Sequence, residues 1–176
     1  MVKSINFKHM TTCFVVLGVS GSGKTTLGKL LAKRLDLAFY DADDFHPPAN
    51  IDKMSRGEPL DDLDRQPWLK ALAEKLLKWH QAGGAVLACS ALKEKYRKLL
   101  AQNDVPITWI YLGVDEATVK KRFASRAGHF MPSSLIKSQF NTLEPPNYGI
   151  QVDGSQPPGL IIQHILDILK ATGTTF

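Results

Sequence analysis

The sequence has few cysteines and no long apolar run, and these absences limit what the protein can be. Among 176 residues only Cys13 and Cys89 are cysteines, and each lies inside an apolar run. Neither has metal-ligand neighbours at zinc-site spacing, so we predict two buried thiols rather than a disulfide or a zinc site. No apolar stretch approaches the ~20 residues that a membrane span needs. Residues 1–10 lack the apolar core of a secretory signal, so we expect a disordered leader, no membrane association and a cytoplasmic protein.

Positively charged residues are in modest excess over negatively charged ones. The chain has 22 Lys and Arg residues against 17 Asp and Glu residues, a formal net charge of +5. A basic surface can attract nucleic acid, but it serves equally well to draw in anionic small molecules. Because the sequence has no aromatic-basic repeat and no long Lys/Arg block, we expect small anionic ligands and no nucleic acid.

Strand-like and helix-like segments alternate along the chain, which predicts an α/β domain around a parallel sheet. We expect strands at 13–17, 37–40, 85–89, 107–112 and 148–152. We expect helices at about 24–34, 67–82, 92–101, 116–126, 133–143 and 160–169. Residues 44–67 are rich in Pro, Asp and Arg and too long for a plain connector, so we predict a functional insertion there. Residues 11–176 are expected to form one domain.

A glycine-rich motif follows the first predicted strand and matches G-x-x-x-x-G-K-[ST] at every fixed position. Its expected phosphate-binding residues are Gly18, Ser20, Gly21, Ser22, Gly23, Lys24, Thr25 and Thr26. Glycines let successive backbone N–H groups converge on phosphates, and the helix N-terminus adds partial positive charge. Lys24 can reach the β- and γ-phosphates, and the Thr25 hydroxyl can ligate Mg²⁺. The motif predicts ATP and Mg²⁺ as cofactors and a three-layer P-loop NTPase fold, a five-stranded parallel sheet with helices on both faces.

Other P-loop classes lack support in the sequence. A guanine-reading Asn-Lys-x-Asp stretch is absent, and the third predicted strand ends at Ser90 without the carboxylate typical of motor ATPases. These features disfavour GTPases and water-activating ATPases, and leave a kinase as the leading interpretation.

The second predicted strand ends in carboxylates at Asp41 and Asp43. The carboxyl ends of parallel strands open onto the ligand crevice, and the two residues would share a face if the strand continued. We assign Asp41 to the Mg²⁺ hydration shell and Asp43 to proton acceptance from a substrate hydroxyl. The alternative is a solvated acidic turn or a set of N-caps, which fits Asp44 better than the other two.

The chain resembles bacterial gluconokinases from about residue 13 to residue 146. The resemblance rests on the motifs His46-Pro, Asn50-x-x-Lys-Met, Gly57-x-Pro-Leu-x-Asp-x-Asp-Arg65, Trp68-Leu, Cys89-Ser-Ala-Leu-Lys93, Tyr96-Arg97, Arg122-x-x-x-Arg126-x-Gly-His129-Phe and Gln139-Phe-x-Thr-Leu-Glu144-x-Pro. It implies ATP-dependent phosphorylation of D-gluconate at its terminal hydroxyl, a shikimate-kinase-like fold with a mobile lid, and a homodimer. Residues 148–158 match no family motif, which leaves the adenine contacts open.

A gluconate pocket needs cations for the carboxylate and polar groups for the hydroxyls. The candidate substrate residues besides Asp43 are His46, Arg56, Arg65, Lys93, Tyr96, Arg97 and His129; arginine is favoured where a bidentate contact is needed. For any one cation the alternative is a surface residue with no role. Trp68 and Leu69 are expected to anchor a helix in the core.

Two arginines mark the expected lid over residues 122–138. Arg122 and Arg126 are four residues apart on one helix face, just before Gly128. We predict that both cover the triphosphate, exclude water and neutralise charge during transfer, which makes them catalytic together with Lys24 and Asp43. The alternative is a basic helix end that interacts with the helix dipole.

Two rival functions are weighed. Another small-molecule kinase of this architecture, such as shikimate kinase, is disfavoured because the glycine triplet of that family is replaced here by Ser90-Ala-Leu-Lys93. A non-catalytic nucleotide-binding module would not need the dense polar segment from Asp41 to Arg65.

Overall fold

The computed structural model describes residues 13–125 and 133–172. The leader at 1–10, Arg126 and His129 therefore lie outside the described residues. Within these ranges the chain forms a five-stranded parallel sheet in the order β2-β3-β1-β4-β5. The strands are β1 Cys13–Leu17, β2 Ala38–Asp41, β3 Ala85–Ala88, β4 Ile107–Gly113 and β5 Ile150–Asp153. The predicted sheet is thus confirmed.

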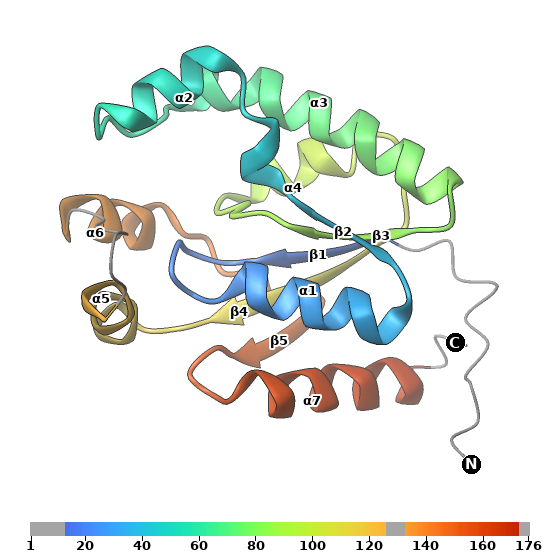
Figure 1. The fold of residues 1–176 in the computed structure, drawn as a ribbon. Helices are drawn as coiled ribbons and strands as arrows, with labels where there is room; N and C mark the ends of the chain where they lie inside the picture. The colour runs from blue at the N-terminus through green and yellow to red at the C-terminus, as the bar shows by residue number, and fades with distance from the viewer. Residues whose placement is uncertain (1–12, 126–132, 173–176) are drawn as a thin grey trace.

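Helices cover both faces of this sheet (Figure 1). Their bounds are α1 Lys24–Leu35, α2 Pro48–Ser55, α3 Asp62–Gln81, α4 Glu94–Leu100, α5 Glu116–Ala124, α6 Ser133–Thr142 and α7 Pro158–Ala171, with a short 3-10 helix η1 at Ala42–Phe45. In Figure 1, α1 and α7 lie below the sheet, α3 and α4 above it, and α5 and α6 beside its carboxyl edge. None of the described helices is both long and apolar enough to span a bilayer.

The alternation of side chains along β1 builds two cores. Phe14 and Val16 pack with residues of α1 and α7, whereas Cys13, Val15 and Leu17 pack with residues of α3 and α4. All five are buried, as expected for a central strand of a parallel sheet. This core holds the carboxyl ends of the strands in place, and the functional residues follow those ends.

Helix α3 begins earlier than predicted. The sequence suggested a start at Pro67, but the helix begins at Asp62 because Asp61 and Asp64 form a reciprocal capping box. Pro67 then lies inside the helix, where its missing N–H leaves the carbonyl of Leu63 without its helical donor. Leu63 is highly exposed, so water can bind that oxygen. The predicted insertion also contains α2, which was not among the predicted helices.

Candidate functional site

The loop between β1 and α1 has the strained backbone that the glycine motif predicts. Gly18, Gly21 and Gly23 have positive φ angles of 150°, 79° and 106°. A Cβ on Gly18 would lie 2.8 Å from the carbonyl oxygen of Leu112, and one on Gly21 would lie 2.7 Å from the ring of Phe123. Both positions are therefore restricted to glycine by conformation and by space.

Polar groups gather inside this loop. The Ser22 hydroxyl is buried and, among the described residues, has no hydrogen-bond partner. The Lys24 ammonium donates to the carbonyl oxygen of Val19 over 3.0 Å. Burial lowers the pKa of Lys24, while Asp43 and Asp41 oppose that shift. An orphaned hydroxyl beside an enclosed cation fits phosphate oxygens.

Two side-chain oxygens meet where the start of α1 lies close to the end of β2. The Thr25 hydroxyl donates to a carboxylate oxygen of Asp41 over 2.7 Å. Hydroxyl and carboxylate oxygens suit Mg²⁺, which takes few protein ligands and several phosphate or water oxygens. Within residues 13–125 and 133–172, no group of three or more His, Cys, Asp or Glu side chains is placed to hold a metal ion. The Thr25 hydroxyl and the Asp41 carboxylate together supply two oxygens, which fits a metal whose other ligands are phosphate and water oxygens.

Asp43 lies near Asp41 for a different reason than predicted. The strand β2 ends at Asp41, so the two residues do not share a strand face. Instead, the Asp41 carboxylate caps η1 by accepting from the Asp43 backbone N–H over 3.2 Å. The Asp43 side chain lines a large cavity and is 79% exposed. Its pKa is raised by partial loss of hydration at the cavity wall and by repulsion from the nearby Asp41 carboxylate.

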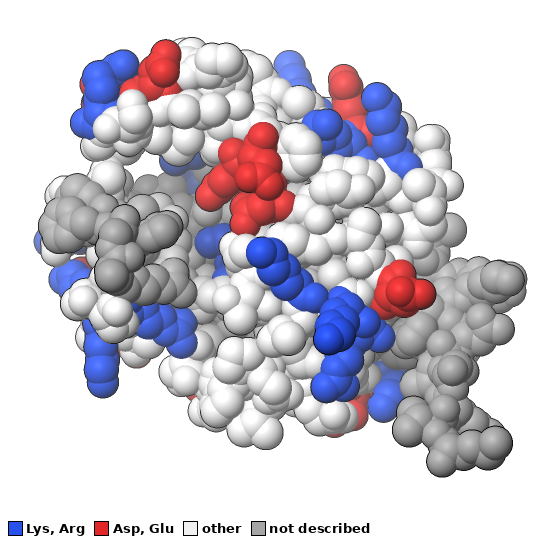
Figure 2. Space-filling model, in the orientation of Figure 1, with Lys and Arg blue, Asp and Glu red and all other residues white. Residues whose placement is uncertain are grey.

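This large cavity has a volume of about 420 Å³. It lies between the insertion, the segment after β3 and helix α6, and Figure 2 shows a hollow in this part of the surface with acidic side chains at its edge. Five predicted substrate residues line it: Asp43, His46, Arg65, Lys93 and Tyr96. Ser20 of the glycine loop also lines the cavity, so one wall belongs to the phosphate-binding loop.

The cations of the cavity are tied to neighbouring groups. The Lys93 ammonium lies 3.1 Å from the Asp62 carboxylate, which also accepts from Lys95 and the Tyr96 hydroxyl. These three donors hold the pKa of Asp62 well below its usual range. The Arg65 guanidinium donates to the carbonyl oxygen of Leu60 and lies 5.6 Å from the centre of the Tyr96 ring.

Two predicted substrate cations do not line this cavity. Arg97 is only 2% exposed. Its guanidinium donates to the side chains of Glu94 and Tyr148 and to the backbone oxygens of Ala91, Leu92 and Glu144. With these contacts Arg97 joins α4 to the segment before β5, and its guanidinium does not line the cavity. Arg56 is exposed and pairs with Glu58 over 2.8 Å outside the cavity lining.

Arg122 of α5 reaches the phosphate loop. Its guanidinium donates to the backbone oxygens of Ser22 over 2.7 Å and Gly154 over 2.5 Å. It also lines a second cavity of about 210 Å³, together with Thr26 and Gln156. Gly154 and Pro158 line the same cavity, so the segment between β5 and α7 borders a cavity next to the phosphate loop.

Two residues of the site had no predicted role. The Gln139 side chain of α6 accepts from the Ser20 backbone N–H over 2.7 Å and donates to the Ser20 hydroxyl over 2.9 Å. Asn50, buried in α2, bonds to His46 and to the backbone of Asp64. Both belong to motifs of the noted resemblance, but only the fold reveals their partners.

Comparisons with known proteins agree with this geometry. The family model described as shikimate kinase matches residues 20–141. A gluconokinase from Gluconobacter oxydans is 45% identical over 89% of this chain and 90% of its own length. The crystal structure of a gluconokinase from Sinorhizobium meliloti superposes with a TM-score of 0.85 at 39% identity, covering 93% of this chain and 94% of the other. The shikimate kinase structure from Aquifex aeolicus, at 20% identity and a TM-score of 0.61 over 93% of this chain and 99% of its own, shows the shared fold.

Proposed function

The chain belongs to the gluconokinase family of shikimate-kinase-like proteins, and from that premise we propose that it transfers the γ-phosphate of ATP to the terminal hydroxyl of D-gluconate. The products are 6-phospho-D-gluconate and ADP. One observation carries the proposal: a single cavity is walled by Ser20 of the phosphate loop and by Asp43, His46, Arg65 and Lys93 of the acceptor side.

The cavity has the chemistry that gluconate requires. A polyol carboxylate needs positive charge for one end and hydrogen-bonding groups along its length. We assign the carboxylate to the side of Arg65 and Lys93, and the hydroxyls to His46 and Tyr96. His129, which lies outside the described residues, is retained as a further proposed contact on the lid.

Asp43 is the proposed proton acceptor. Its carboxylate opens into the cavity, and its pKa is raised, which brings it closer to the range useful for general base catalysis. It takes the proton of the attacking hydroxyl as the bond from that oxygen to the γ-phosphorus forms. The bond from the phosphorus to the β-phosphate oxygen breaks in the same transfer, and ADP leaves.

Lys24, Arg122 and Arg126 are the proposed electrostatic stabilisers of that transfer. Lys24 is fixed at the loop by its contact with Val19, and Arg122 by its contacts with Ser22 and Gly154. Cations held in place before the reaction cost no reorganisation when charge develops. The backbone N–H groups of the loop, with Ser22, Thr25 and Thr26, are assigned to phosphate binding.

Thr25 and Asp41 are the residues proposed to hold Mg²⁺, Asp41 through the metal's hydration shell. When bound, the metal supplies positive charge to the β- and γ-phosphate oxygens. We further propose a homodimer, a cytoplasmic location, and one domain over 11–176 with an acceptor insertion at about 44–67 and a lid at about 122–138. The dimer rests on the family resemblance.

The rival small-molecule kinases and the non-catalytic module predict different behaviour in one assay. Purified protein with Mg-ATP is incubated with D-gluconate, shikimate, other aldonates or buffer, and ADP release is measured. We expect rapid ADP release with D-gluconate and only background release with shikimate, the other aldonates or buffer. A protein that binds ATP but gains no rate from gluconate would contradict the proposal; stimulation by shikimate would instead favour the other kinase.

A further inference from the structure

The imidazole of His46 is held firmly in the wall of the acceptor cavity. Its side chain is only 4% exposed. The ring stacks on the indole of Trp68, with a centroid distance of 4.1 Å and an interplanar angle of 18°. The Trp68 indole is itself fixed, because its N–H donates to the carbonyl oxygen of Ala42 over 2.9 Å. The ring therefore has a defined orientation, and the position of its proton becomes a structural question.

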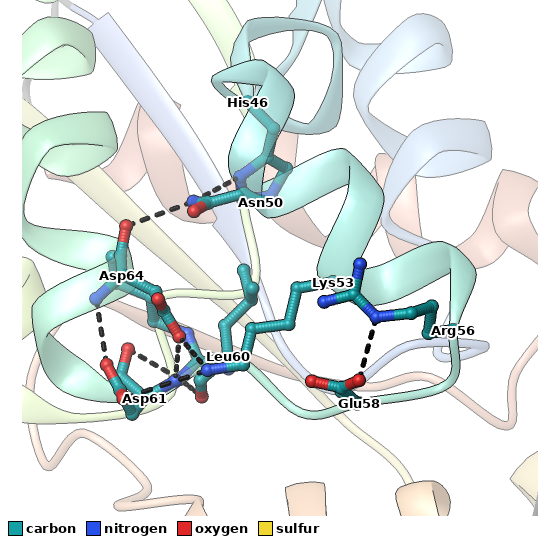
Figure 3. A network of polar contacts seen from close by, with 9 residues as sticks. His46, Asn50, Lys53, Arg56, Glu58, Leu60, Asp61 and Asp64 are labelled. Carbon is teal, nitrogen blue, oxygen red and sulfur yellow. Dashed lines mark hydrogen bonds and ion pairs between the residues drawn. The ribbon is translucent and has the colours of Figure 1, made fainter.

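The side-chain amide of Asn50 determines which ring nitrogen of His46 carries the proton. Asn50 is 3% exposed, and its nitrogen lies 3.0 Å from the carbonyl oxygen of Asp64. A carbonyl oxygen only accepts hydrogen bonds, so the NH₂ end of the amide must face Asp64. The same nitrogen lies 3.3 Å from Nδ1 of His46, and Figure 3 shows Asn50 between the two partners.

The amide nitrogen has two hydrogens and no available lone pair. One hydrogen points to Asp64 and the other to Nδ1 of His46, so Nδ1 must be the acceptor. A neutral imidazole with an acceptor at Nδ1 carries its proton on Nε2. That nitrogen lies 3.7 Å from a carboxylate oxygen of Asp43 and faces the cavity side.

The charged groups around the ring are compatible with the neutral form. Asp43 of η1 favours a protonated ring, whereas Arg65 of α3 opposes it. Burial is the largest influence and lowers the pKa of His46. A second proton could enter only at Nδ1, where it would meet the N–H of Asn50.

We propose that Asn50 is a positioning residue that holds His46 in the Nε2–H tautomer, so that the ring donates a hydrogen bond into the acceptor cavity. In this tautomer neither nitrogen is free to take a proton from the substrate, because Nδ1 is occupied and Nε2 already carries a hydrogen. Asp43 is thereby left as the proton acceptor. The tautomer follows from the geometry alone, and its catalytic consequence rests on the proposed function.

The test is direct observation of the His46 ring nitrogens. In the full-length protein labelled with ¹⁵N, correlations between ring nitrogens and ring C–H groups distinguish the two tautomers and the imidazolium. We expect His46 to show a protonated Nε2 and an unprotonated Nδ1 at neutral pH, with exposed His164 as the internal reference for an unconstrained ring. A wild-type His46 that is protonated at Nδ1, alone or with Nε2, would overturn the proposal without any variant.

The variant Asn50→Asp tests the cause. It has nearly the same shape, but its carboxylate presents an acceptor to Nδ1 and loses the bond to the Asp64 carbonyl oxygen. We therefore expect a proton at Nδ1 and a His46 that titrates at higher pH. With gluconate, we expect kcat to fall roughly tenfold while the KM for ATP stays unchanged. The variant His46→Gln, which keeps an N–H donor near the Nε2 position, should retain more activity than His46→Asn. An Asn50→Asp protein with the wild-type tautomer and wild-type kcat would refute the positioning role.

Failure of this inference is distinguishable from failure of the proposed function. The tautomer is measured without any substrate, and gluconate-dependent ADP release is measured on the wild-type protein alone. A wild type that is inactive with gluconate but shows the expected tautomer would overturn the function and keep the geometric assignment.

Discussion

The two sides of the proposed site differ in how they are held. On the nucleotide side, the phosphate loop joins the strand β1 to the helix α1, and both pack into the core. The strand β1 pairs with β3 and β4, and α1 packs its buried face on the same sheet. On the acceptor side, α2 and the start of α3 are joined by polar side chains. The Lys53 ammonium lies 2.6 Å from the Asp64 carboxylate and 3.8 Å from that of Asp61, and both Lys53 and Asp64 are 25% exposed.

This difference predicts how salt and single substitutions affect the two sides. A backbone held by buried strands is insensitive to salt and to most single side chains. A partly exposed ionic network is partly screened by salt and depends on each member. Figure 3 shows how Lys53, Asp61, Asp64 and Asn50 connect α2 to α3.

The largest expected effect lies on the nucleotide side. Lys24→Ala removes the enclosed cation of the phosphate loop and should lower kcat by roughly 100-fold or more. The control is Lys33→Ala, which alters an exposed lysine of the same helix and should leave turnover unchanged. Both are measured as gluconate-dependent ADP release. Activity of Lys24→Ala above about a tenth of wild type would contradict its phosphate role.

Asp43→Asn tests the proposed proton acceptor, which belongs to the acceptor side of the site. We expect kcat to fall roughly 100-fold with little change in ATP affinity, because the proton acceptor is lost and the phosphate loop is untouched. Asp44→Asn, at the neighbouring position that does not line the cavity, serves as the control. Equal kcat values for Asp43→Asn and wild type would remove Asp43 from the chemistry.

The pH dependence of wild-type activity is a second test of Asp43 as the proton acceptor. The carboxyl must be ionised to accept a proton, and its pKa is raised by lost hydration and by Asp41. As pH falls through that raised pKa, activity should disappear at a higher pH than an ordinary aspartate would dictate. This acid limb of kcat/KM should be absent from the residual activity of Asp43→Asn.

Arg97→Met separates a structural cation from a binding one. The guanidinium is buried and satisfies three backbone oxygens, so its loss should destabilise the fold by about 2–3 kcal/mol. Chemical denaturation measures this, with exposed Lys98→Met as the control. At a temperature where the variant stays folded, its KM for gluconate should equal that of wild type. A selective rise in that KM would restore the substrate role that the sequence suggested.

The smallest effect is expected for the ionic network of the insertion. Lys53→Met should raise the KM for gluconate several-fold and leave kcat and the KM for ATP unchanged, because it loosens α2 against α3. The matched control is Lys70→Met, at an exposed position of α3. Added salt should raise the wild-type KM for gluconate and have less effect on the variant. A variant with wild-type KM and wild-type salt dependence would remove the network from substrate binding.

Much of this protein follows from local sequence. The Gly18–Thr25 motif predicts both its backbone and its position between a strand and a helix, since only glycine tolerates the φ angles at Gly18, Gly21 and Gly23. The alternation of apolar runs and helical periodicity predicts the parallel sheet, because each pattern specifies which faces must be buried. Both cysteines are buried and unpaired, as predicted. The family motifs indicate the acceptor without any geometry.

Other features depend on contacts between residues far apart in the chain. The motif Tyr96-Arg97 places two polar residues side by side, and only the fold directs Tyr96 to the cavity and Arg97 to the backbone oxygens of Leu92 and Glu144. The start of α3 was missed because Pro67 is a strong local signal, whereas the capping box is defined by reciprocal bonds between Asp61 and Asp64.

The protonation of His46 belongs to this second group. It depends on an amide four residues away whose orientation is fixed by a carbonyl fourteen residues further along. Sequence by itself therefore determined the fold class, the phosphate loop and the family, because these rest on short-range periodicity, backbone conformation and motif. Tertiary structure alone decided which charged groups line the acceptor cavity and which polar groups meet there, because hydrogen bonds depend on distances that sequence spacing does not set.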